Sequence, residues 1–155
     1  MTNAPSFDWH LTNLRNWTHL DNTDHQSATF GSLAVSQPDS GIATAALPGS
    51  NTAVGRFVRA VYYCNFVEKA ADPDAAVATL SAIVNNFDRP RGATIDPPGD
   101  GGEGMNIPGV TGNSTEYTTN SFLADTPRTR YYTRAYTALN WSVVDLARLA
   151  AMSLS

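Results

Sequence analysis

Three segments near the C-terminal end carry residues typical of extended structure, and two short turns separate them. Thr, Tyr, Phe, Trp and Val are frequent in segments 116–124, 128–138 and 141–146, and these residue types suit a pleated sheet. The turns at 125–127 and 139–140 are too short to join parallel strands, which need a long crossover. The sequence therefore predicts a three-stranded antiparallel meander.

The first 90 residues have the apolar spacing of helices instead. Apolar side chains recur three and four residues apart over 6–20, over 52–70 and from Asp72 to the residue before Pro90, which predicts three helices. Asp72 suits an N-cap and Pro73 the first helical position. The link between the second and third helices is very short, so we expect them to be antiparallel neighbours. Helices followed by an antiparallel meander predict an α+β fold.

Two long connections interrupt these elements. Segment 21–51 is rich in Ser, Thr, Asp and Gly and poor in periodicity, and we expect one short strand in it, near 30–35. Segment 93–112 holds three prolines and six glycines, a composition that predicts a flexible surface loop. With 155 residues, the chain is long enough for one domain, or part of one, with a packed core.

The charge balance excludes two classes of partner. The chain has 14 acidic residues against 10 basic ones, and it lacks the clusters of Lys and Arg that bind nucleic acid or an anionic membrane. It has no run of 18 apolar residues, so no transmembrane helix is predicted. The first 20 residues lack the basic and apolar blocks of a signal peptide. We expect no nucleic-acid or membrane partner, and the compartment stays open.

The sequence offers no pattern for a metal or a cofactor. His10 and His19 are nine residues apart on one predicted helix, which rotates them away from a common face. No zinc-helix, P-loop or serine-hydrolase motif is present, so we expect neither a metal nor a cofactor. The single cysteine, Cys64, lies among apolar residues of the second predicted helix. We expect it to be a buried, inert thiol rather than a nucleophile.

Asn3 is the first candidate site residue. It stands between a polar strand end and the helix predicted from Ser6. A side-chain amide in such a place can stabilise the oxyanion of a tetrahedral intermediate. Asn is also a preferred residue at helix starts, so Asn3 is either an oxyanion donor or a helix-flanking cap.

Arg56 is the second candidate. Arg56 and Arg59 are three residues apart on one predicted helix face, shortly after the Leu-Pro-Gly run at 47–49. A fixed guanidinium near a reacting thiol favours the thiolate and orients an N-terminal amine. Arginines near a helix start more commonly form a solvated face or a salt bridge. The residues alone leave both possibilities open.

Taken together, the motifs resemble one family, the choloylglycine hydrolases and penicillin V acylases. The opening is similar to the family's "TN-x-P-x-FDW" signature, and a later block is similar to its "LPGD…SRFVRA". Two positions of that block depart from the pattern, because Ser50 stands in place of Asp and Gly55 in place of Ser. The matching segments follow one another in the family's order: 2–5, 7–14, 47–49, 56–60, 85–92, 116–118, 131–136 and 144–146.

The resemblance implies a fold and an activity. Members have the αββα sandwich of N-terminal nucleophile hydrolases and cleave linear amides such as conjugated bile salts or penicillin V through an N-terminal cysteine. By the motifs, Asn3 resembles the oxyanion-hole asparagine and Arg56 the arginine that contacts the cysteine. The family's segment with that cysteine has no counterpart in these residues.

From this resemblance we expect residues 1–155 to be the C-terminal portion of one such domain, without its nucleophile half. The isolated chain should be inactive, while the longer parent should be an amidase for a small-molecule amide, homo-oligomeric, and cytoplasmic or periplasmic. The alternative is a non-catalytic truncated product, or a subunit that only associates with another chain. Such a product should leave apolar faces exposed.

Overall fold

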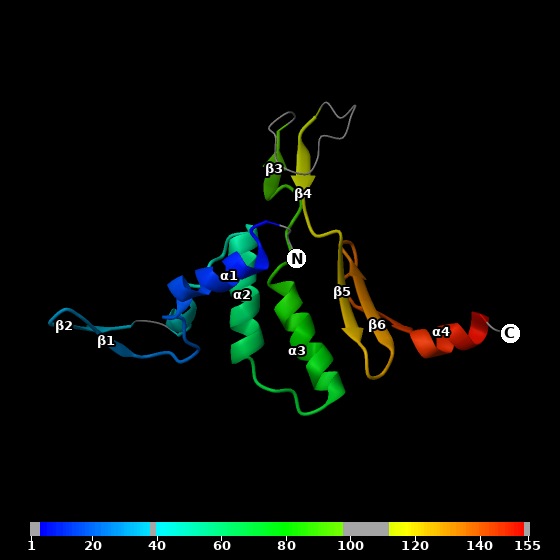
Figure 1. Ribbon diagram of the computed structural model, residues 1–155, viewed down its shortest axis with the longest axis horizontal. Coiled ribbons are helices and arrows are strands. Elements are labelled where there is room, and N and C mark those ends of the chain that lie inside the picture. Colours follow the sequence, from blue (N-terminus) through cyan, green and yellow to red (C-terminus); the bar gives the residue numbers. More distant parts are fainter. Residues whose placement is uncertain (1–3, 38–39, 98–111, 154–155) are drawn as a thin grey trace. The chain divides into compact units, whose positions relative to one another are not determined.

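The computed structural model describes residues 4–37, 40–97 and 112–153. Helices and antiparallel strands follow one another in separate runs along the chain (Figure 1), so the predicted α+β class is confirmed. The chain divides into two compact units, Met1–Glu68 and Lys69–Ser155. Each unit is described by itself.

The first unit begins with the predicted helix. α1 spans Phe7–Asn13 and continues as a 3-10 helix, η1, over Leu14–Trp17. Ser6 caps α1, because its Oγ accepts a hydrogen bond from the amide of Trp9. The helix predicted over 6–20 is therefore confirmed, but it ends at Trp17, three residues earlier than expected, and its final turn is tighter than that of an α-helix.

Segment 21–51 contains more structure than expected. It forms a hairpin of β1 (Ser27–Phe30) and β2 (Leu33–Ser36), where one strand was predicted. Gly31 turns the chain with a φ of 62°, a conformation that favours glycine. A short 3-10 helix, η2, follows at Ile42–Thr44. All eight strand residues are exposed, so the hairpin has no buried face.

α2 spans Ala53–Phe66 and supplies the buried centre of the first unit. Thr52 caps it by accepting from the amide of Gly55 at 3.1 Å. Val58 and Tyr62 are buried four residues apart on one face. Cys64 lies off that face and is exposed, so the expectation of a buried thiol is wrong.

The second unit is a helix packed on the predicted meander. α3 spans Pro73–Asn85, and Asp72 caps it by accepting from the amide of Ala75 at 2.8 Å. β5 (Asn120–Asp125), β6 (Arg130–Ala135) and β7 (Ser142–Asp145) form one antiparallel sheet in chain order. The three-stranded meander is therefore confirmed.

One face of β5 forms the core of the second unit. Leu123 and Ser121 are buried while their neighbours along the strand are exposed, and α3 contacts this strand. In the register, Leu123 lies opposite Tyr132 of β6, which lies opposite Val143 of β7. The alternation of buried and exposed residues shows which side of the sheet faces the helix.

Three short elements of the second unit were not predicted. β3 (Thr94–Asp96) lies within the segment expected to be a loop and pairs with β4 (Ser114–Glu116). Each of these strands is three residues long, too short to show a period. The rest of that predicted loop, 98–111, lies outside the described residues. α4 (Leu146–Ser153) follows β7 directly.

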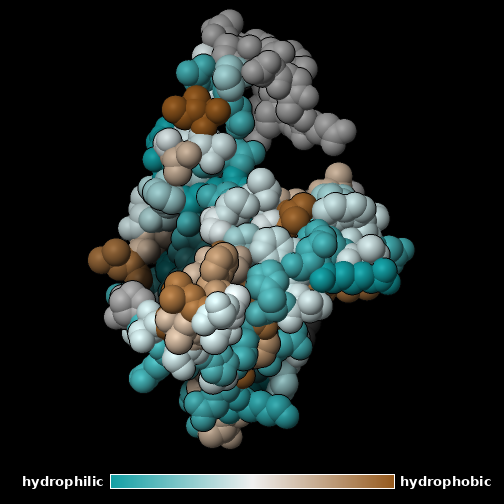
Figure 2. Space-filling view, turned by 90° about the vertical axis from the view of Figure 1, so that its left-hand side faces the viewer, coloured by the Kyte–Doolittle hydropathy of each residue, from teal (hydrophilic) through white to brown (hydrophobic). Residues whose placement is uncertain are grey.

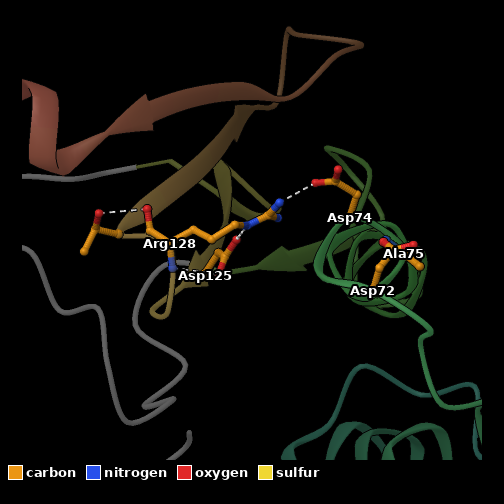
Figure 3. Close-up of polar contacts among 6 residues, drawn as sticks. Asp72, Asp74, Ala75, Asp125 and Arg128 are labelled. Carbon is orange, nitrogen blue, oxygen red and sulfur yellow. Dashed lines mark hydrogen bonds and ion pairs between the residues drawn. The ribbon is translucent and has the colours of Figure 1, made fainter.

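Arg128 joins two parts of the second unit (Figure 3). Its Nη1 donates to Asp74 in the first turn of α3 at 2.6 Å, and its Nε donates to Asp125 at the end of β5. The hydrogen bond from Arg128 lowers the pKa of Asp74. The two carboxylates in turn raise the pKa of Arg128, Asp74 first and Asp125 second. The contact ties the helix start to the β5–β6 turn.

Large apolar side chains reach the surface in several places. Phe30 and Leu33 of the hairpin are 83% and 62% exposed, and Leu149 and Met152 of α4 are exposed as well. Figure 2 shows apolar residues scattered among hydrophilic ones on one face. Within the described residues, none of the helices has the length and apolar character needed to span a membrane.

Candidate active site

Of the two predicted site residues, the structure describes Arg56 but not Asn3. Asn3 lies outside the described residues. Arg56 lies in α2, and its backbone amide donates to the carbonyl oxygen of Thr52 at 3.0 Å. Its side chain is half-buried. Arg56 is therefore held near the N-terminal end of the helix.

An aromatic contact joins the segments on which the two candidates stand. Phe57, next to Arg56, stacks on His10 with ring centres 4.4 Å apart and meets Phe7 edge-on at 6.0 Å. His10 is only 4% exposed. Phe7 is the first residue of α1 and lies four positions after Asn3. The start of α1 therefore packs beside the part of α2 that carries Arg56.

Arg59 has a structural role that the sequence did not reveal. It is 6% exposed, so it does not belong to a solvated helix face. Its Nη1 donates to the carbonyl oxygens of Pro48 at 2.7 Å and Ser50 at 2.6 Å. Hydrogen bonds from a charged donor are stronger than neutral ones. A partner that is a backbone carbonyl eleven residues away leaves no signature in the sequence.

The two departures from the family motif lie against each other. A Cβ atom added at Gly55 would overlap Ser50 Oγ and would lie 2.8 Å from the Ser50 carbonyl oxygen. Ser50 Oγ also lies 2.9 Å from Thr52 Oγ1, within hydrogen-bond distance. Gly55 is therefore needed where the turn before α2 approaches the helix. The two unusual residues belong to one local arrangement.

A cavity of about 370 Å³ lies in the second unit, away from both candidates in sequence. Its lining includes Asp88, Ser121 and Arg134. Asp88 accepts from Ser121 at 3.3 Å and also pairs with Arg134, which donates to Asn85 at 2.8 Å. These polar groups hold one another, an arrangement typical of a structural network. In the part of the chain that the structure describes, no group of three or more His, Cys, Asp or Glu could hold a metal ion.

Comparison with known proteins places the chain in a family. The family model described as linear amide C-N hydrolases, choloylglycine hydrolase family, matches residues 1–152. The chain belongs to this family, and the resemblance seen in its motifs is confirmed.

Curated relatives match at moderate identity. The conjugated bile acid hydrolase of Lactobacillus acidophilus is 31% identical over 99 residues, which cover 64% of this chain and 31% of that protein. The bile salt hydrolase/transferase of Bifidobacterium longum is 25% identical over 149 residues, which cover 96% of this chain and 46% of that protein. The chain thus spans less than half the length of these two relatives.

Solved structures agree on the fold. A mutant conjugated bile acid hydrolase from Clostridium perfringens has a TM-score of 0.73 at 21% identity, covering 96% of this chain and 41% of that one. Penicillin V acylase from Agrobacterium tumefaciens has a TM-score of 0.60 at 25% identity, covering 96% and 36%. The described elements therefore match part of the N-terminal nucleophile hydrolase fold, as predicted.

Proposed function

We propose that this chain is part of an amidase that hydrolyses linear amide C–N bonds through a cysteine nucleophile located outside the 155 residues. The family match over residues 1–152 carries the proposal. The only cysteine of the sequence, Cys64, is exposed on α2 in the described structure. Cys64 lies within a helix, whereas the nucleophile of the family is an N-terminal cysteine. The isolated chain should therefore lack amidase activity.

The proposed reaction proceeds by acyl transfer. The cysteine thiolate attacks the amide carbonyl carbon, and the C–N bond breaks as the protonated α-amine of the cysteine gives its proton to the leaving amine. Water then attacks the thioester and gives a proton back to that α-amine, and the acid and the thiolate are released. The amide of Asn3 donates a hydrogen bond to the oxyanion of each tetrahedral intermediate. Arg56 lies beside the cysteine and favours its thiolate form. Packing of Phe57 on His10 supports this proposal, because it brings α1, which follows Asn3 in the sequence, beside the residue next to Arg56.

We propose a small-molecule acyl amide as the substrate. The relatives are named for conjugated bile acids, bile salts and penicillin V, and each of these substrates contains an amide outside a peptide chain. We also propose that the longer protein forms a homo-oligomer. Phenoxymethylpenicillin and a glycine-conjugated bile acid are the first substrates to assay.

A second candidate function is association without catalysis. The observation that favours it is the exposure of large apolar side chains such as Phe30 and Leu33, since such surfaces commonly mark contacts with another chain. In that case, the chain would complete its layers against a separate subunit. Its assembly would persist in variants that abolish any amidase activity.

The test compares four proteins on both substrates. The isolated chain should show no turnover, and the chain expressed with the coding sequence upstream of it should release the free amine. Arg56→Ala in the longer protein should abolish most of that activity, while Arg15→Ala, at an exposed arginine of η1, should not. Equal activity in the two variants would remove Arg56 from the site. Absence of a cysteine-bearing segment upstream would favour the second candidate.

A further inference from the structure

The turn at residues 48–52 leads into α2 and is held by a side chain from within that helix. Arg59 Nη1 bonds the carbonyl oxygens of Pro48 and Ser50 at 2.7 and 2.6 Å. A single nitrogen thus joins two carbonyls that are two residues apart. Because Arg59 is only 6% exposed, water does not readily replace these bonds, and opening the turn leaves polar groups buried and unsatisfied.

The same turn contacts the first residues of α2 on the side of Gly55. Thr52 Oγ1 lies 2.9 Å from Ser50 Oγ and accepts from the Gly55 amide at 3.1 Å. The space between Ser50 and Gly55 is too small for a Cβ atom. A displacement of the turn must therefore displace the first turn of the helix as well.

Arg56 is the next residue after this contact. Its amide donates to the carbonyl oxygen of Thr52 at 3.0 Å, so its backbone position follows that of the turn. On its other side, Phe57 is fixed by the stack on His10. The backbone that directs the Arg56 side chain is thus fixed from two sides, by the 48–52 turn and by α1.

We propose that Arg59 is a positioning residue for Arg56 in amide hydrolysis. Arg59 fixes the 48–52 turn, the turn fixes the start of α2, and the start of α2 directs the Arg56 guanidinium. The inference rests on the proposed function, because it is there that Arg56 orients the cysteine. Misplacement of a catalytic group by about 1 Å can cost on the order of 100-fold in rate. Loss of the two hydrogen bonds from Arg59 to the turn, which we call the clamp, should therefore lower kcat. It should leave KM unchanged, since substrate contacts are not altered.

The first arm of the test measures amide hydrogen exchange by NMR on the 155-residue chain and needs no activity. Arg59→Met removes both hydrogen bonds at similar volume. Arg59→Lys keeps the charge on a shorter side chain and serves if the methionine variant does not fold. The amides of Gly55 and Arg56 should exchange at least ~10-fold faster in Arg59→Met and by a smaller factor in Arg59→Lys, while the Tyr62 amide should change by less than ~2-fold. Arg15→Lys is the matched control and should change none of them.

The second arm measures kcat and KM of the same variants in the longer, active protein. The expected result is a loss of ~10- to 100-fold in kcat for Arg59→Met with KM unchanged, partly restored in Arg59→Lys. Uniformly faster exchange along α2, or unchanged exchange at Arg56, would overturn the inference whatever the activity. So would an unchanged kcat in Arg59→Met when Arg56→Ala is impaired. If Arg56→Ala is itself fully active, the proposed function fails, and the exchange result still tests the clamp.

Discussion

The close approach of Gly55 to Ser50 gives the sharpest stability prediction. Gly55→Ala adds one methyl group inside a helix, where alanine is ordinarily better than glycine by about 1 kcal/mol. Here the added Cβ would overlap Ser50 Oγ and lie 2.8 Å from the Ser50 carbonyl oxygen. The hydroxyl can rotate away, but it then loses its 2.9 Å contact with Thr52 Oγ1. The carbonyl cannot move without disturbing its 2.6 Å bond to Arg59.

These opposing effects can be weighed. Overpacking of a well-packed site costs about 1–3 kcal/mol, and the loss of one hydrogen bond costs about 1 kcal/mol more. Set against the gain of about 1 kcal/mol from helix propensity, the net expectation is a destabilisation of about 1–3 kcal/mol. The double variant Ser50→Ala/Gly55→Ala removes the overlap with the hydroxyl and should recover part of this loss.

The assay is urea unfolding of the first unit, monitored by tryptophan fluorescence. The chain has three tryptophans, and Trp141→Phe leaves Trp9 and Trp17, which both lie in the first unit. Gly49→Ala is the matched control, because nothing lies within 4 Å of a Cβ at that position. It should stay within about 0.5 kcal/mol of the parent. A Gly55→Ala variant that is more stable than the parent would refute the reasoning.

Three further perturbations test other contacts. Hydrogen bonds from backbone amides, chiefly that of Ala43, lower the pKa of Asp24 below its ordinary value of 3.8. The ionised carboxylate therefore stabilises the folded form above pH 3.8, and this stability is lost as the pH falls through the lower pKa of the folded form. Exchange of the Ala43 amide should rise over that acidic range, and Asp24→Asn should remove most of this pH dependence. Arg128→Ala breaks the link between α3 and the β5–β6 turn, so the melting temperature of the second unit should fall, and Arg128→Lys should restore part of it. Leu123→Ala, at a buried position of β5, should cost about 2–4 kcal/mol in urea unfolding; a loss below 1 kcal/mol would contradict its place in the core.

Much of the fold could be predicted because its signals are local. Asp72 and Pro73 mark the start of α3, and both act as their chemistry predicts. The meander was visible because β-forming residues are grouped between short turns. β3 and β4 were not visible, because each obtains its hydrogen bonds from a partner about twenty residues away.

The candidate site was less accessible to sequence reasoning. Arg56 was selected by its position in the family motif. The role of Arg59 could not be predicted, because its partners are the backbone carbonyl oxygens of Pro48 and Ser50, and every residue type has such a carbonyl. Cys64 was expected to be buried because its sequence neighbours are apolar, yet helix geometry turns it away from the face of Val58 and Tyr62. Contacts between backbone groups and side chains distant in sequence carry no residue signature. The structure is needed to find them.

We propose that the 155-residue chain contributes Asn3 and Arg56 to the active site of an amidase whose cysteine lies outside it. The most direct measurement is kcat for release of amine from phenoxymethylpenicillin or a glycine-conjugated bile acid. It compares the longer protein, its Asn3→Ala and Arg56→Ala variants, and the isolated chain. We predict a loss of about 100- to 1,000-fold in kcat for Asn3→Ala, as for other oxyanion-hole donors, a strong loss for Arg56→Ala, and no turnover by the isolated chain. Turnover by the isolated chain, or full activity in both variants, would contradict the account.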